Sequence, residues 1–167
     1  MHRLALITGA VLVAGLSTAP PAHADCTDAA SPEVNWRRCI FDGQDFSNID
    51  LTQAQLRDAS FRRSILDGSD LSGADAFRAR FINASMIEVL FDGARLFDAD
   101  FTGADLTNAS FVGADLGSAN MVGATLVGAD LTDANLARTG LRNADLSGAT
   151  WIDGERVCAE GSIGRCN

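Results

Sequence analysis

The sequence predicts an all-β solenoid, because its apolar residues recur at every fifth position without interruption. From Phe41 to Trp151, the residues whose numbers end in 1 or 6 are apolar at 23 consecutive positions. A small residue stands two positions before 20 of these 23 centres, and it is alanine at 16; Gln44, Ile49 and Val89 are the exceptions. A period of five fits neither the α-helix nor the strand, whose periods are 3.6 and 2. Each five-residue unit must therefore turn a corner by itself.

The composition of the unit explains how it turns and what it buries. One large and one small apolar side chain point inward, and the other three positions carry Asp, Asn, Ser, Thr, Arg and Gly. Glycine fills the second position after the centre nine times, for example at Gly43 and Gly103, which suits a tight corner that needs a relaxed φ. One unit cannot bury its own apolar face, so successive coils must stack on one another.

The pattern A(D/N)LxG is visible at Ala104-Asp105-Leu106, at Ala129-Asp130-Leu131 and at Ala144 to Gly148. It resembles the pentapeptide-repeat family. The resemblance implies a right-handed quadrilateral parallel β-helix with four units, or 20 residues, per coil. The five-residue unit comes from the sequence, whereas the count of four comes from the resemblance. On that basis residues 39–153 form the β-helix, with 5–6 coils, and both ends are capped by residues 25–38 and 154–167.

Residues 1–24 are predicted to be a secretory signal peptide. Arg3 supplies a positive start, Leu4 to Leu16 is an apolar run, and Ala22-His23-Ala24 is a small-x-small cleavage site. The run is shorter than a membrane span requires, so no integral span is expected after cleavage. The predicted location is secreted or periplasmic; the alternative is an uncleaved anchor.

Four cysteines remain in the chain after cleavage, and two lie in each terminal segment. A disulfide needs Cα atoms within about 7 Å, which excludes pairs formed across the whole length of the rod. We therefore predict the disulfides Cys26–Cys39 and Cys158–Cys166, in keeping with an oxidising compartment. The alternative is four free thiols.

The sequence contains no Lys and no Tyr. The processed chain would also lack His, because His2 and His23 leave with the signal peptide. This excludes Ser-His-Asp and Cys-His sites, imidazole-bound zinc and Schiff-base lysines. We predict no catalytic residue, no cofactor and no metal site. An enzyme acting on glycans through paired carboxylates is the least favoured alternative.

Five outward or irregular residues form a candidate interaction patch: Phe77, Ile82, Ile87, Leu90 and Phe97. Phe77 and Phe97 are 20 residues apart and should stack. The patch either binds a partner or a second copy of the chain, or it stabilises the sheet locally, as aromatic and β-branched residues do.

The leading functional hypothesis is an exported, non-enzymatic structural or protein-interaction module. Its partner would be a protein or a component of the cell envelope. A net charge of −9 argues against binding of nucleic acid. The resemblance supplies an alternative, since some members of the family mimic DNA with an acidic rod and bind DNA gyrase. The export signal and the lack of a helical element after Trp151 count against this alternative.

Overall fold

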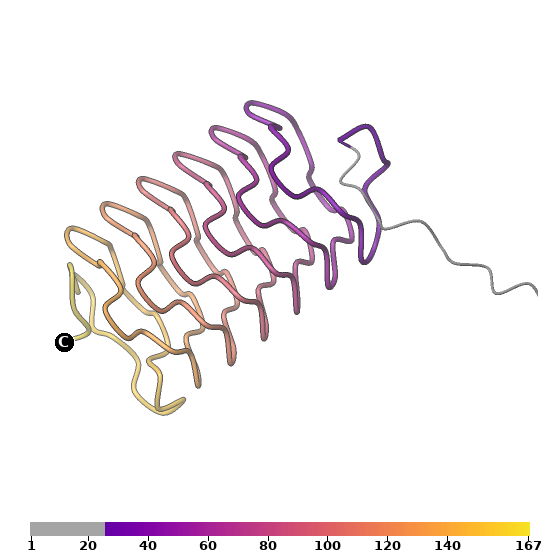
Figure 1. The fold of residues 1–167 in the computed structure, drawn as a ribbon. Helices are drawn as coiled ribbons and strands as arrows, with labels where there is room; N and C mark the ends of the chain where they lie inside the picture. The colour runs from indigo at the N-terminus through magenta and orange to yellow at the C-terminus, as the bar shows by residue number, and fades with distance from the viewer. Residues whose placement is uncertain (1–25) are drawn as a thin grey trace, which may run out of the picture.

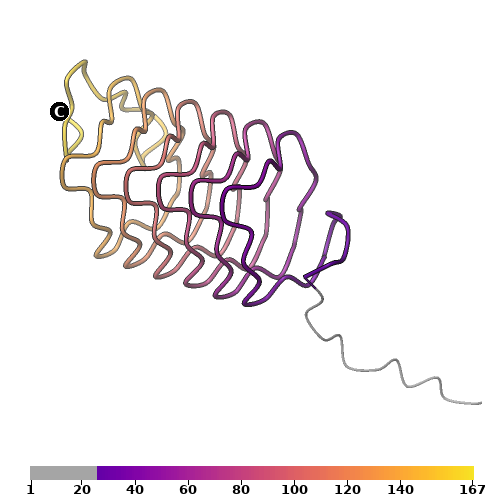
Figure 2. The same ribbon diagram turned by 90° about the horizontal axis from the view of Figure 1, so that it is seen from above.

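The computed structural model describes residues 26–167, which form one continuous stack of coils (Figures 1 and 2). Parallel bridges join residues that are 20 apart along the whole stack, from Asn35↔Gln55 to Asp130↔Thr150. Each coil therefore contains four five-residue units, as the resemblance implies. The predicted signal peptide lies outside the described residues.

The β-structure of residues 26–167 consists of isolated bridges, and this part of the chain contains no helix and no longer strand. Each unit contributes a single bridge residue, followed by an extended residue and a two-residue turn. We number the positions of a unit from its large inward residue, so that Leu51 to Gln55 occupy positions 1 to 5. The bridges then fall at position 5.

The units close with the same turn, except that the Ile49 N–H donates to the Ser69 hydroxyl oxygen. The N–H at position 4 donates to the C=O at position 1, as from Ala54 to Leu51 at 3.0 Å. The residue at position 3 adopts a positive φ in every unit from Glu33 to Gly148. This left-handed residue is the third of four in the turn, as in a type II turn. Its conformation lets positions 1 and 4 point to the same side, which is the interior.

The interior is filled by side chains at positions 1 and 4. From Leu51 to Leu131, none of these residues exposes more than 2% of its surface. Aromatic rings stack along the axis, with ring centroids 5.4 Å apart between Phe61 and Phe81 and 5.0 Å apart between Phe81 and Phe101. Val89, which breaks the small-residue rule, is also fully buried. The core is thus a packed column, and functional groups must lie outside it.

Hydroxyl side chains replace alanine at three position-4 sites and are satisfied inside the column. Ser64, Ser69 and Thr139 donate to the position-1 carbonyls of the preceding coil at 2.9, 2.6 and 2.8 Å. The described residues contain no buried side-chain nitrogen or oxygen without a hydrogen-bond partner. Serine and threonine therefore fit this position at no cost of an unpaired polar group.

Backbone bonds between coils use three of the five N–H groups in a unit. Positions 1 and 3 donate to the following coil, as from Leu56 to Asp75 at 2.8 Å, and position 5 donates to the preceding coil, as from Ser60 to Cys39 at 2.8 Å. The turn uses a fourth N–H. The N–H at position 2 has no backbone acceptor in this scheme, so it needs a side chain or water.

Aspartate or asparagine at position 5 supplies that acceptor. Asp50 accepts from the Thr52 N–H at 2.9 Å, and Asp130 accepts from the Thr132 N–H at 2.9 Å. The carboxylate also accepts from the hydroxyl of the same threonine. This local bond is the physical reason for the Asp or Asn that precedes the central Leu in the repeat.

Three aspartates perform the same task from the coil before. Asp42, Asp67 and Asp92 stand at position 2 and accept from the position-2 N–H that lies 20 residues later, at 3.0, 2.9 and 3.2 Å. Each also accepts from the serine hydroxyl 18 residues later, at a position 5 where aspartate is missing. We call these three residues the cross-coil aspartates.

The coil begins earlier than the sequence interpretation placed it. The turn geometry is already present at Glu33, whose N–H donates to the Thr52 carbonyl at 2.8 Å, and Trp36 is buried at position 1. The coil therefore starts near residue 31 rather than at residue 39. Two units thus precede Phe41: the first has Ser31 in place of an apolar residue at position 1, whereas the second has Trp36 there and follows the apolar rule.

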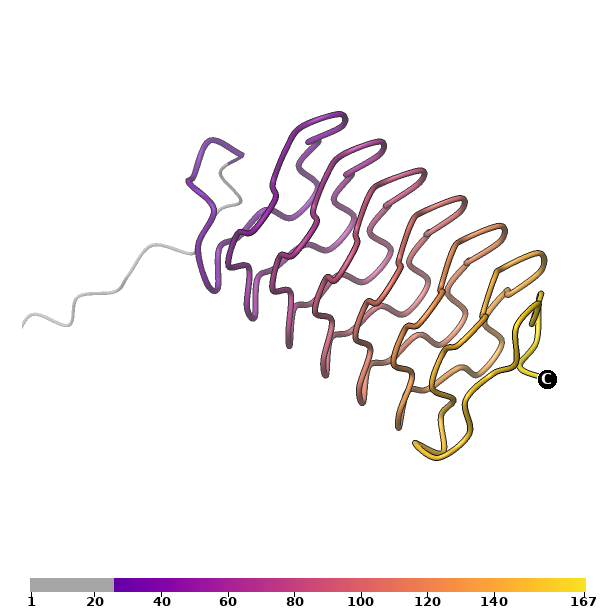
Figure 3. The same cartoon turned by 180° about the vertical axis from the view of Figure 1, so that it is seen from behind.

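The segments beyond the coil are tied down by disulfides. Cys26 is joined to Cys39 and Cys158 to Cys166, with Cα atoms 5.5 and 4.8 Å apart, and these are the pairs that the sequence predicts. The C-terminal segment pairs antiparallel with the last coil through Asp145↔Ile163 and Thr150↔Val157. Seen from behind, it crosses only part of the end of the rod (Figure 3).

The turn geometry yields a first prediction. Gly93 has a φ of +63°, and a Cβ atom added there would meet no other atom within 4 Å, so a substitution tests backbone strain alone. We expect Gly93→Val to lower the free energy of unfolding by about 1–2 kcal/mol, because an L-residue with a branched side chain is strained in this region. Gly93→Asn should cost less, since asparagine tolerates the left-handed conformation. Equal losses in urea unfolding would contradict the assignment of the turn.

The cross-coil aspartates yield a second prediction. Asp67→Ala should destabilise the protein by about 1 kcal/mol, because the Ile87 N–H and the Ser85 hydroxyl both lose their acceptor. Asp67→Asn keeps an acceptor oxygen and serves as the matched control. The measurement is the denaturant midpoint of each variant. An alanine variant as stable as the asparagine variant would refute the role of Asp67 as a cross-coil acceptor.

Candidate functional site

The outer surface of the rod is divided into two sides by charge. One side comprises residues 45–53 and the stretches that stack on them at intervals of 20, up to residues 145–153. It contains no arginine and eleven acidic residues: Asp45, Asp50, Asp67, Asp70, Glu88, Asp92, Asp105, Asp130, Asp133, Asp145 and Asp153. We call this the acidic side. Its repulsive charges are spread along the full length of the coil.

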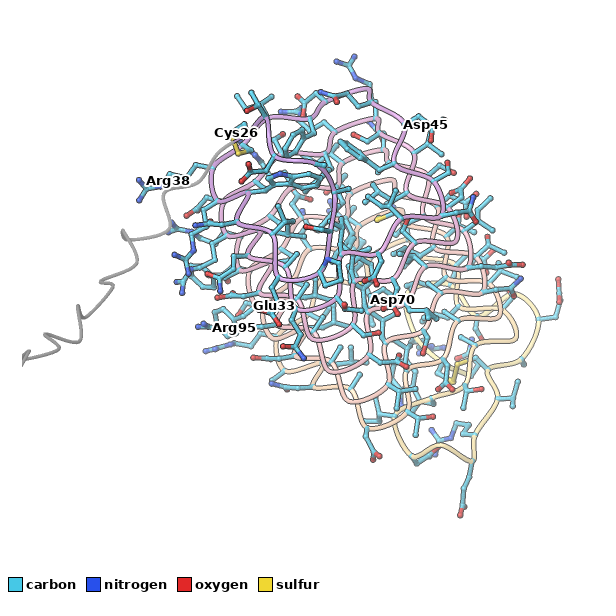
Figure 4. The ribbon with its side chains drawn as sticks, turned by 90° about the vertical axis from the view of Figure 1, so that its right-hand side faces the viewer. Cys26, Glu33, Arg38, Asp45, Asp70 and Arg95 are labelled. Atoms are coloured by element: carbon cyan, nitrogen blue, oxygen red, sulfur yellow. A yellow bond between two sulfur atoms is a disulfide. The ribbon has the colours of Figure 1, made fainter. Side chains whose placement is uncertain are left out.

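The remaining half of each coil carries the arginines. Residues 34–44 and the stretches stacked on them, up to residues 134–144, contain ten arginines and six aspartates. We call this the arginine side. Figure 4 shows the division along the axis, with Arg38 and Arg95 on one side and Asp45 and Asp70 on the other. The sequence contains this separation of arginines from acidic residues, but it becomes visible only when the residues are aligned by the 20-residue coil.

Ion pairs on the arginine side follow the stacking of coils. Arg78 lies 2.7 Å from Asp58, and Arg95 lies 3.8 Å from Asp75, with both pairs 20 residues apart. Arg57 also approaches Asp75, at 3.5 Å. All of these side chains are solvent-accessible, so each pair contributes about 0–1 kcal/mol. Their main effect is to support the register between coils.

Phe77 lies inside this group of charges. The guanidinium carbons of Arg57, Arg78 and Arg95 lie 4.9, 4.9 and 5.3 Å from its ring centroid, within the range of cation–π attraction. The Phe77 ring stacks on Phe97 with centroids 6.2 Å apart. These contacts account for a half-buried aromatic ring at this position.

Phe97 continues the stack toward Gly117, which is itself buried. A Cβ atom added at Gly117 would lie 2.9 Å from the Phe97 ring, so the glycine makes room for the aromatic side chain. The two phenylalanines therefore pack within the surface of the coil. This packing favours the local interpretation of the pair.

The other members of the predicted patch lie on different parts of the coil. Ile82 and Ile87 stand at position 2 of consecutive units and are half-buried, whereas Leu90, at position 5, is 39% exposed. The structure thus brings together only Phe77 and Phe97 from the five residues. A partner site built from the whole patch stays a prediction.

Two features are absent from the described residues, a metal-holding cluster and a membrane-spanning helix. They contain no group of three or more His, Cys, Asp or Glu side chains arranged to hold a metal. Within residues 26–167, no helix is long and apolar enough to cross a bilayer. The features that remain are the two charged sides and the two ends of the rod.

Comparison with known proteins agrees with the coil geometry. The profile described as pentapeptide repeats matches eight copies over residues 45–81, 77–113 and 109–148, which together cover more than half of the chain. The chain belongs to the pentapeptide-repeat family. No curated protein sequence matches it.

Solved structures of pentapeptide-repeat proteins share the fold. HetL from the cyanobacterium Nostoc, described as involved in the regulation of heterocyst differentiation, is 27% identical with a TM-score of 0.50 over 76% of this chain and 73% of its own. A thylakoid-lumen protein of Arabidopsis thaliana, AT2G44920, is 32% identical with a TM-score of 0.57 over 59% and 68%. These neighbours imply that the coil is a right-handed β-helix.

Hydrogen bonds hold several surface carboxylates in their charged form. The Ser47 hydroxyl and then its N–H lower the pKa of Asp45, and the Thr52 N–H and then its hydroxyl lower the pKa of Asp50. The Ser147 hydroxyl, followed by its N–H, lowers the pKa of Asp145. A negatively charged acceptor for the position-2 N–H is thus favoured in the folded state.

A third prediction concerns stability in acid. Because these pKa values are lower in the folded chain than the value of about 3.9 for an unfolded aspartate, the contribution is present above pH 4. It is lost as the pH falls from about 4 through the folded pKa values. We expect the Asp45→Asn, Asp50→Asn and Asp145→Asn triple variant to lose less stability than the wild type between pH 5 and pH 2.5 in urea unfolding. Parallel curves would contradict this role of the carboxylates.

Proposed function

We propose that this pentapeptide-repeat protein is an exported, non-enzymatic interaction module that docks a cationic partner surface on its acidic side. The observation that carries the proposal is the sorting of charge, with eleven acidic residues and no arginine on one side of the coil. The core is filled by side chains, so binding groups must come from the outer surface. A protein or a cell-envelope component with basic groups would complement this side.

The disulfides support a location outside the cytoplasm. Both cysteine pairs are joined, and disulfides persist mainly in oxidising compartments. Cys26 would stand two residues after the proposed cleavage site. A family member from the thylakoid lumen provides a precedent for a pentapeptide-repeat protein in such a space. The first residue of the native protein tests this part directly, and we expect Asp25.

Binding to DNA gyrase is a second candidate, favoured by the same acidic side. A row of carboxylates along a rod presents negative charge as a nucleic acid does. Cell fractionation separates the two candidates, because gyrase is cytoplasmic. A cytoplasmic pool that protects purified gyrase from a quinolone would favour the second candidate and would overturn the first.

The fourth prediction uses two aspartates that differ in little but their side of the rod. Asp133 lies on the acidic side and Asp98 on the arginine side; both occupy position 3, with φ of 57° and 59°, and both are exposed. Arginine is tolerated at this position, as at Arg63 and Arg138. Asp133→Arg and Asp98→Arg therefore change the net charge equally and leave the turn intact.

The measurement is the dissociation constant for immobilised poly-L-lysine, taken at 0.15 M salt, where the Debye length is about 8 Å. We expect Asp133→Arg to weaken binding about threefold or more, whereas Asp98→Arg should weaken it clearly less. Equal losses for the two variants would show that net charge alone matters, and would contradict docking on one side.

A further inference from the structure

Within residues 26–167, each end of the rod is only half covered, and the covered halves lie on opposite sides. At the N-terminal end, Cys26–Cys39 and the bond from the Trp36 ring N–H to the Asp28 carbonyl hold residues 26–30 against the arginine side. At the C-terminal end, the antiparallel segment pairs with residues 144–151, on the acidic side. Figure 4 shows Cys26 on the left and the yellow C-terminal segment on the right.

Burial of the inward residues shows which halves are open. In the first coil, Trp36 and Cys39 are 1% exposed, whereas Phe46 and Ile49 are only partly buried. In the last coil the order is reversed: Ala144 and Leu146 are fully buried, but Leu136 and Leu141 are only partly buried. The open half of one end therefore lies on the same side of the rod as the covering segment of the other end.

The backbone groups left unpaired at the two ends are complementary. On the open half of the last coil, the N–H groups of Leu136, Arg138, Leu141 and Asn143 have no acceptor within residues 26–167. On the open half of the first coil, the carbonyls of Asp42, Asp45, Ser47 and Asp50 accept no hydrogen bond within the same residues. Donors thus prevail at one end and acceptors at the other, and each set lies on the side of the rod where the opposite end carries its covering segment.

Exposed apolar side chains also gather at the ends. Six large apolar residues are exposed in the described part of the chain, and four of them lie near the ends of the rod: Ile40 at 68% in the first coil, Ile152 at 39% at the end of the last coil, and Val157 at 61% and Ile163 at 50% in the C-terminal segment. Burial of such side chains favours association.

The charges of the two ends favour a head-to-tail arrangement. Arg138 and Arg142 are exposed on the open half of the last coil, and residues 134–144 include no acidic residue. The N-terminal segment, which would lie over this half, carries the exposed acid Asp28. A two-fold pairing of two such C-terminal edges about Gly140 would instead place Arg138 opposite Arg142 of the second copy, where like charges repel.

We propose that this chain binds a second copy of itself head to tail, with the covering segment of each end seated on the open half of the other. The coils of the two copies then continue in one direction. The exposed N–H groups on the open half of the last coil face the N-terminal segment of the next copy, and the exposed carbonyls on the open half of that copy's first coil face the C-terminal segment. Such a contact joins different surfaces and does not close, so it extends into rows of copies. This proposal stands apart from docking on the acidic side, which the row leaves accessible.

The test is sedimentation velocity of the oxidised protein that begins at Asp25, from about 1 to 500 μM at 0.15 M salt. The proposal predicts a concentration-dependent series of dimers, trimers and longer rows. Arg138→Glu with Arg142→Glu should weaken association at least tenfold. Arg63→Glu with Arg62→Glu is the matched control, since these arginines occupy the same unit positions in mid-rod, and it should leave the series unchanged.

A second pair of variants separates association from folding. Val157→Asp with Ile163→Asp alters two exposed side chains and should abolish the series while the disulfides and the unfolding midpoint persist. Mixing Arg138→Glu with Asp28→Arg should restore contact between the two variants. A monomer at every concentration would overturn the proposal, as would a single dimer in which cross-links join the Arg138 regions of both copies.

Discussion

The whole coil depends on a left-handed residue at position 3 of each unit. With positive φ there, the chain turns through a corner in four residues and directs positions 1 and 4 into the same column. Only glycine reaches this conformation freely, yet fifteen non-glycine residues adopt it, each at a cost of about 1–2 kcal/mol. Stacking offsets this strain, because each coil bonds to its neighbours at three N–H groups per unit and buries a continuous core.

The turn also determines the surface. It leaves the position-2 N–H without a backbone acceptor, and aspartate supplies one either from position 5 of the same turn or from position 2 of the coil before. Many carboxylates on the rod therefore have a structural role as acceptors for the position-2 N–H, and the negative charge of the surface is a consequence of that role. Their distribution is a separate matter, because arginine could have been placed between them on the acidic side and was not. That distribution is where we locate the binding function.

The period of five and the small residue before each centre were enough to predict the unit, the filled core and both disulfides. The coil of 20 residues could be inferred only from the resemblance, since the sequence does not show how many units close a turn. The first unit was missed because Ser31 breaks the apolar rule while Glu33 already adopts the turn.

The patch around Phe77 was predicted from outward positions alone. Its cation–π contacts with three arginines from different coils require knowledge of which residues stack.

The central claim is that left-handed turns place residues 20 apart on top of one another along the whole rod. Couplings transmitted through hydrogen bonds, measured by NMR on isotope-labelled protein, test it most directly. The account predicts couplings from the Leu90 N–H to the Ser69 carbonyl and from the Phe91 N–H to the Ser110 carbonyl, and likewise in every coil. Couplings that joined residues at other separations, or none beyond the local turns, would contradict it.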